Sequence, residues 1–147
     1  MIAPTQIISI LGDELVWDFA EGADEVKIFT DDDMEDLTDD QYQTLLNTKV
    51  TPCVVELPVS RYYEKMEKVN FEGGNVIEFL NMIHKFYYAP TTKDFLDDLK
   101  SSNLTDNFGY IRRAKIGVMR IKLMGDMRAF EGFELNKDGS YLISLGS

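Results

Sequence analysis

The chain contains one histidine, His84, and one cysteine, Cys53. A histidine can serve as a general base near neutral pH, and a thiolate beside it is a nucleophile. Such a pair needs an orienting acid, and no Gly-x-Ser-x-Gly nucleophile elbow offers another route to acyl transfer. One histidine and one cysteine are too few for a typical zinc site. We interpret Cys53 as a small apolar core residue and His84 as a histidine at the core boundary.

Residues 31–40 include seven acidic side chains. The alternation of Asp31, Asp33 and Glu35 matches the first ligands of an EF-hand calcium loop. That loop also needs a glycine and a closing glutamate at positions that Asp36 and Tyr42 occupy here, so the pattern fails. We interpret the run as a solvated loop before a helix.

Paired carboxylates such as Asp39–Asp40 and Asp97–Asp98 could perform acid/base chemistry. Neighbours on a helix point about 100° apart, however, and pairs are expected by chance among 26 acids. Gly73, Gly74 and Asn75 precede a predicted helix but lack the phosphate-loop signature, so a turn and an N-cap explain them. The sequence therefore predicts no catalytic residue, no cofactor and no metal ligand.

A basic stretch runs from residue 112 to residue 128, where Asp126 is the only acid. Tyr110 and Phe130 flank it, and bases with aromatic rings suit nucleic-acid backbones and stacking. This stretch is the candidate interaction surface, and its six basic residues are Arg112, Arg113, Lys115, Arg120, Lys122 and Arg128.

Charge is divided unevenly along the chain. Residues 1–60 carry 14 acids against Lys27 and Lys49, and residues 61–147 carry 12 acids against 13 bases, which gives −12 and +1 and a net charge of −11. A protein with this net charge generally repels nucleic acid unless one face is strongly basic. We favour attraction between the two halves within the fold, and an open basic face for an external partner is the alternative.

Length and composition fit one soluble domain. The chain has 147 residues, of which 44% are hydrophobic, enough to bury a core. A single cysteine excludes an internal disulfide and fits a reducing compartment. No apolar run approaches the roughly 20 residues of a membrane span, and the first residues lack the basic start of a signal peptide. We expect an intracellular protein.

The last 25 residues predict a β-hairpin. Apolar Phe133 and Leu135 alternate with polar residues, Ile143 and Leu145 repeat the pattern, and the segment 136–139 ends on a turn glycine. Gly132 shifts the side-chain parity between Phe130 and Phe133, as a β-bulge would. We expect this apolar C-terminal segment to lie in the core.

Three helices carry start signals. Capping-box residues precede Val76–Tyr88 and Asp39–Asn47, and Thr92 precedes Lys93–Lys100. The helix Val76–Tyr88 leaves only a narrow polar stripe, so we expect it to be largely buried.

Strand signals are weaker. We predict strands at Gln6–Leu11, Leu15–Phe19 and Glu25–Thr30. Two prolines place Thr51–Val59 at a sheet edge or in a connection. The apolar residues of the segment 104–122 fit both the helical and the strand period. We favour a helix to Ala114 and a strand from Met119.

The order of segments from Asn75 onward is similar to a known family. A buried helix ends in Phe-Tyr-Tyr-Ala-Pro-Thr-Thr (residues 86–92), and an Asp-rich helix follows. Leu-Met-Gly-Asp (123–126), Phe-Glu-Gly-Phe (130–133) and the closing Asp-Gly-Ser-Tyr and Leu-Gly-Ser complete the pattern. Over residues 75–147 the chain resembles small uncharacterised proteins of nucleocytoplasmic large DNA viruses, the giant viruses. The resemblance implies a viral origin and a host-cell setting, and it implies no catalytic residue.

These observations predict a single α+β domain with an antiparallel sheet that includes the C-terminal hairpin, packed on the helix 76–88 and short helices. We expect a non-enzymatic protein-interaction factor, virion-associated or host-directed, that binds protein partners without a membrane. One alternative is nucleic-acid or nucleoprotein binding through residues 112–128. The other is an acidic decoy in which residues 31–40 engage basic proteins.

Overall fold

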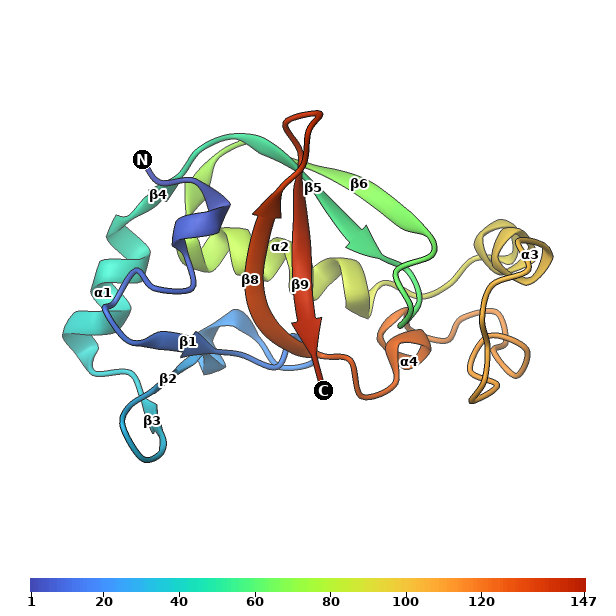
Figure 1. Ribbon diagram of the computed structural model, residues 1–147, viewed down its shortest axis with the longest axis horizontal. Coiled ribbons are helices and arrows are strands. Elements are labelled where there is room, and N and C mark those ends of the chain that lie inside the picture. The colour runs from blue at the N-terminus through green and yellow to red at the C-terminus, as the bar shows by residue number, and fades with distance from the viewer.

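A four-stranded sheet forms the centre of the computed structural model, which describes residues 1–147 (Figure 1). Its order is β6 (Met66–Phe71), β5 (Cys53–Pro58), β9 (Tyr141–Gly146) and β8 (Ala129–Leu135). The neighbours are antiparallel except β5 and β9, which are parallel at Val55–Tyr141 and Glu56–Leu142. The α+β class is confirmed, with a mixed sheet in place of a purely antiparallel one.

Helices and smaller sheets surround this centre. The helices are α1 (Asp39–Asn47), α2 (Val76–Tyr88), α3 (Lys93–Ser101) and α4 (Ile121–Met124), with 3-10 turns η1 (Pro4–Gln6) and η2 (Ala23–Glu25). A three-stranded antiparallel sheet joins β1 (Glu14–Val16), β2 (Lys27–Phe29) and β3 (Met34–Asp36), and β4 (Lys49–Val50) pairs with β7 (Gly74–Asn75). None of the helices has both the length and the apolarity needed to cross a bilayer.

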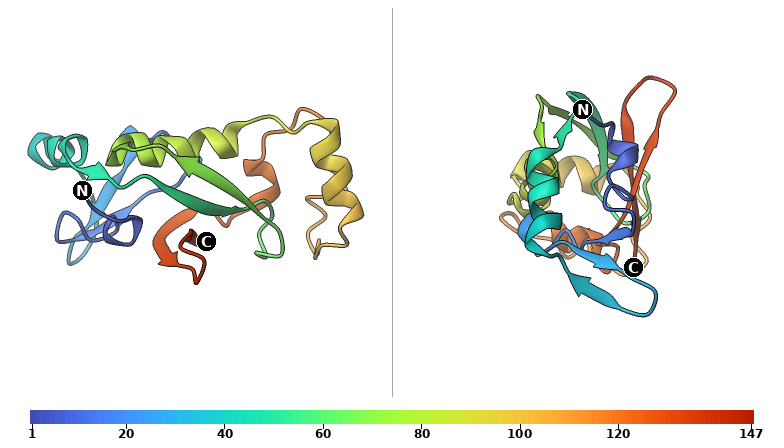
Figure 2. Two further views of the ribbon diagram at one scale, coloured as in Figure 1. Left: turned by 90° about the horizontal axis from the view of Figure 1, so that it is seen from above. Right: turned by 90° about the vertical axis from the view of Figure 1, so that its left-hand side faces the viewer.

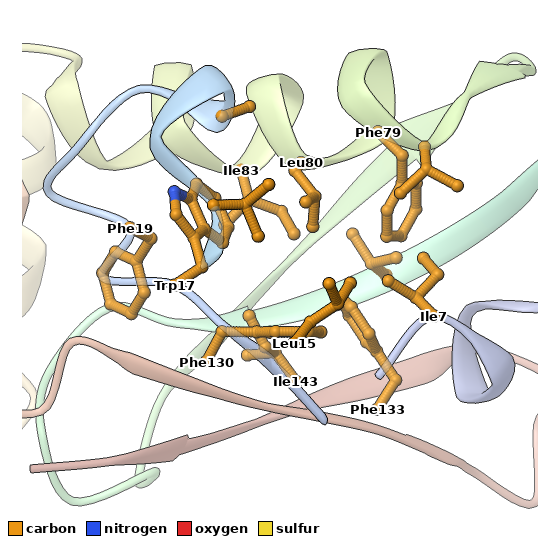
Figure 3. Close-up of a cluster of buried hydrophobic side chains, with 14 of the residues drawn as sticks. Ile7, Leu15, Trp17, Phe19, Phe79, Leu80, Ile83, Phe130, Phe133 and Ile143 are labelled. Atoms are coloured by element: carbon orange, nitrogen blue, oxygen red, sulfur yellow. The ribbon is translucent and has the colours of Figure 1, made fainter. Parts of the chain in front are cut away.

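Helix α2 forms one wall of the main core, as its sequence predicts. Asn75 accepts from the Glu78 N–H at 2.8 Å and the Glu78 side chain accepts from the Asn75 N–H, which completes the capping box. The inner face, with Phe79, Leu80 and Ile83, packs over β8 and β9, and Trp17 from the N-terminal segment lies between them (Figure 3).

The C-terminal hairpin is confirmed in detail. β8 and β9 pair from Ala129–Gly146 to Leu135–Tyr141, and the register shifts between Phe130 and Phe133, where Gly132 has a φ of 107°. Ile143 and Leu145 are buried. β9 lies between β5 and β8, so the hairpin supplies an interior strand of the sheet.

The prediction that Thr51–Val59 lies at a sheet edge or in a connection was wrong. Pro52 precedes β5 and Pro58 is its last residue, so the strand between them keeps its N–H groups for the ladder. β5 therefore occupies an interior position with both Val55 and Leu57 fully buried.

Two further local predictions were wrong. Residues 6–11 form the end of the 3-10 turn η1 and further turns instead of a strand, and Ile7 is the one fully buried residue among them. Residues 104–120 contain turns instead of a helix and a strand, since Gly109 and Gly117 adopt positive φ values that interrupt both periods. The predicted strand from Met119 is reduced to one bridge with Pro90 before α4 begins.

The two ends of the molecule differ in content. α1 and the β2–β3 hairpin lie at one end, and α3 with the segment 102–120 lies at the other (Figures 1 and 2). A second, smaller core lies under α3; its members are Val59, Leu96, Leu99, Ile111, Ala114 and Leu123.

Candidate functional site

The predicted basic surface is divided by the fold. Arg120 donates to Glu67 at 2.7 Å, and its guanidinium lies 4.5 Å from the Phe86 ring centre and 4.4 Å from that of Phe95. This contact joins α2, α3 and β6, so Arg120 serves the structure and is not part of an open face.

Arg128 is also engaged within the protein. Its guanidinium lies 3.6 Å from the Asp18 carboxylate, and Asp126 pairs with Arg61 at 3.0 Å. Phe130, which the sequence offered as an aromatic neighbour of the basic stretch, is buried in the main core. It is therefore unavailable for stacking on a ligand.

The other four basic residues of the stretch remain exposed and form no ion pair. Arg112 and Arg113 donate to the backbone carbonyls of Asp106 and Phe108, at 3.3 and 2.6 Å. These bonds hold both side chains against their own loop. Lys115 and Lys122 make no side-chain hydrogen bond.

One groove of about 470 Å³ brings together two of the six basic residues of the stretch. Lys122 and Arg128 line it with Tyr88 and Tyr110, and the exposed Met119 lies beside them. The sequence pointed to Tyr110 but not to Tyr88, whose place depends on the end of α2 meeting the segment around Ala20 through a hydrogen bond from its hydroxyl.

Attraction between the acidic and basic halves is limited. Of the eight ion pairs, two join residues 1–60 to residues 61–147, namely Arg128–Asp18 and Lys68–Glu56. Neither involves the acidic run 31–40. The run has one ion pair, from Asp36 to Lys27 of the same half at 3.8 Å. The attraction between the two halves that the sequence favours is therefore confined to two ion pairs, and the acidic end of the molecule stays open to solvent.

A groove larger than the one at Lys122 and Arg128 lies at this acidic end. It has a volume of about 570 Å³ and is lined by η2, the end of β3 and the start of α1. Four exposed carboxylates belong to it, those of Asp24, Glu25, Asp36 and Asp39. Tyr42 adds an aromatic side chain to the lining.

The start of α1 is capped by its own residues. Thr38 accepts from the Gln41 N–H at 3.2 Å, and the Gln41 side chain accepts from the Thr38 N–H at 2.8 Å. The capping box thus provides acceptors for the N–H groups of Thr38 and Gln41 without the groove carboxylates. Apart from Asp36, which pairs with Lys27, those carboxylates remain free for a cationic group from outside.

The β2–β3 hairpin extends this end of the molecule (Figure 2). Phe29 and Met34 are directly opposite in the register, and their exposed fractions are 48% and 53%. The interpretation of residues 31–40 as a solvated loop was wrong for Met34–Asp36, which pair with β2 as a strand. The sequence also did not indicate that this apolar pair would be exposed, because alternation alone does not show which face of a strand is covered.

His84 and Cys53, the two candidate groups for nucleophilic chemistry, are both partly buried. His84 Nδ1 lies 3.0 Å from the Phe19 carbonyl oxygen, and its ring packs on Tyr88. Burial raises the pKa of the Cys53 thiol, which disfavours the nucleophilic thiolate. No three His, Cys, Asp or Glu side chains gather closely enough to hold a metal ion.

Comparisons of this chain with protein-family models, with curated proteins and with solved structures found no match.

Proposed function

We propose that this protein is a non-enzymatic interaction protein that binds a basic partner protein through its acidic end. The observation that carries the proposal is the open groove between η2, β3 and α1, whose four carboxylates have a single ion pair among them. Lysine and arginine side chains are the protein groups that complement such a surface.

Charge of this kind acts on both affinity and association rate. A concentrated negative end attracts a basic partner over the Debye length, about 10 Å at 0.1 M salt. It also orients the partner before contact, because the opposite end of this molecule carries the exposed Arg112, Arg113 and Lys115. We extend the proposal to a virion-associated or host-directed role, on the resemblance of residues 75–147 to small giant-virus proteins.

Titration calorimetry with core histones as the basic probe tests this function. The triple variant Asp24→Asn, Glu25→Gln, Asp39→Asn should bind at least about tenfold more weakly at low salt, because three groove charges are lost. The matched control is Glu72→Gln, Asp94→Asn, Glu134→Gln, which changes net charge equally at exposed acids without ion pairs.

The control should retain most of the affinity. An equal loss in both variants would show that net charge alone matters and would overturn the groove as the site. No histone binding by the unchanged protein at about 50 mM salt would overturn the function.

A second candidate function is nucleic-acid binding at the opposite end. It is favoured by the groove that joins Lys122 and Arg128 to Tyr88 and Tyr110, since bases can stack on aromatic rings beside cationic groups. Fluorescence anisotropy with a single-stranded oligonucleotide should then show low-salt binding that weakens in Arg112→Glu, Arg113→Glu and in Lys122→Glu. Absence of binding at low salt would rule this candidate out.

A further inference from the structure

We infer that β3 is a docking edge for an extended basic segment of the partner, which adds to the β1–β2–β3 sheet as a fourth, antiparallel strand. This inference rests on the proposed function, because the partner is the same basic protein. β3 is the edge strand of its sheet, and all three of its residues are exposed. Strand addition to such an edge is a recurrent mode of peptide recognition.

The direction of the backbone groups of β3 follows from the hairpin. Thr30 N–H donates to the Asp33 carbonyl at 2.9 Å, and this bond flanks the pair Phe29–Met34, which is therefore a non-hydrogen-bonded pair of the ladder. Bonded and non-bonded pairs alternate in an antiparallel ladder, so Met34 and Asp36 turn their N–H and C=O groups away from β2. The Met34 N–H accordingly bonds to the Asp33 carboxylate at 2.8 Å instead of to β2.

Asp36 is therefore the main pairing position for an added strand. Its N–H and C=O point away from β2, so a residue directly opposite it on an added strand can exchange two backbone hydrogen bonds with it. At Met34 the carbonyl is open, while the N–H is shared with Asp33, a side chain that an incoming strand can displace because it is exposed.

The side chains of β3 define the sequence of the segment that fits. In an antiparallel strand the residues opposite Asp36, Glu35 and Met34 follow one another in chain order. The first two meet carboxylates on opposite faces of the sheet, and the third meets the exposed Phe29–Met34 pair. The matching order is basic, basic, apolar, and residues before it lead toward the acidic groove at Asp36.

The same charges exclude a second copy of this chain. Two β3 edges in contact would place Glu35 and Asp36 of one copy against Asp31–Asp36 of the other, and like charges opposite one another are destabilising. Because the β3 edge repels a second copy of itself and attracts lysine and arginine, it favours a basic partner strand over self-association.

Nuclear magnetic resonance titration of the isotope-labelled protein with short blocked peptides tests the inference. The probe is Gly-Arg-Lys-Ile-Thr-Gly. The matched control, Gly-Arg-Ile-Lys-Thr-Gly, has the same composition but cannot place two consecutive basic residues and then an apolar one opposite β3 in any register. The probe should shift the amide signals of Met34, Glu35 and Asp36 and bind at least about fivefold more tightly than the control.

Backbone methylation of the peptide isolates strand pairing from charge. N-methylation of its arginine, which lies opposite Asp36, removes a hydrogen bond and should weaken binding at least about fivefold. N-methylation of its lysine, whose N–H points away from β3, should leave binding nearly unchanged. In the protein, Asp36→Pro should weaken binding more than Asp36→Asn, because both lose the charge and only proline loses the outward N–H.

Equal binding of both peptide orders, with no effect of methylation, would overturn the docking edge. In that case the proposed function would still stand without the docking edge, provided that the groove variant Asp24→Asn, Glu25→Gln, Asp39→Asn weakened histone binding. Failure of histone binding altogether would instead remove both proposals.

Discussion

Arg120 and Glu67 form the ion pair that removes the middle of the basic stretch from the surface. The two groups are 2.7 Å apart, the Arg120 guanidinium also packs on the rings of Phe86 and Phe95, and the Arg120 side chain is largely covered. In the sequence Arg120 is one of six basic residues of the stretch. In the structure it contacts α2, α3 and β6 and holds them together.

Replacing Arg120 by alanine should lower the free energy of unfolding by about 2–3 kcal/mol, because both stacking contacts and the bond to Glu67 are lost. Arg112→Ala, at an exposed loop position, should change it by less than about 0.5 kcal/mol. Urea unfolding of both variants measures the difference. Similar small effects for both would show that Arg120 is not a structural residue.

Ile143 occupies the centre of the interior strand β9 and is fully buried. Ile143→Ala should destabilise the protein by about 3 kcal/mol, since it leaves a cavity between the sheet and α2. Deletion of Tyr141–Ser147 should abolish cooperative unfolding, because β5 and β8 would lose the strand between them. Ser144→Ala is the control at a position that is not buried, and an unchanged melting temperature for the deletion would refute the interior role of β9.

Asp138 should contribute a pH-dependent part of stability. The Lys68 ammonium and the hydroxyl and N–H of Ser140 hold the pKa of the Asp138 carboxyl well below its usual value. The group is more acidic in the folded state, so its contribution is present above the unfolded pKa of about 4 and is lost as pH falls below it.

Urea unfolding at several pH values between about 6 and 2 should therefore show a smaller acid loss in Asp138→Asn than in the unchanged protein. Asp94→Asn is the control at an exposed acid without an ion pair. The same acid loss in all three proteins would contradict this role for Asp138.

Phe29 should matter for binding and little for folding. It is 48% exposed beside Met34, so Phe29→Ala should change stability by less than about 1 kcal/mol. The same change should weaken histone binding about tenfold, because an exposed aromatic side chain amid charges is a typical anchor of an interface. Calorimetry measures both variants, with Phe108→Ala, at the basic end, as the control that should retain full affinity.

Local signals in the sequence predicted much of the fold. The capping boxes at Thr38 and Asn75 located two helix starts, and Thr92 located the third. The C-terminal hairpin and its bulge followed from alternation, a turn glycine and Gly132. These features could be predicted because each depends on residues within a few positions of one another.

Long-range features could not be predicted in this way. The interior position of β5 depends on its parallel pairing with β9, more than 80 residues later. The segment 104–120 carries both helical and strand periodicity, and contacts with Thr91 and Ala89 hold it in turns instead. No local pattern distinguishes these outcomes.

The sequence by itself determined the charge of each half, the three capped helices and the closing hairpin, because composition and short-range hydrogen bonding are properties of neighbouring residues. Only the tertiary structure decided which charges are free. It packed Arg120 against two aromatic rings, paired Arg128 with Asp18, and left the carboxylates around β3 and α1 open to solvent. Ion pairing depends on which distant elements meet, and that is settled by packing around the main core.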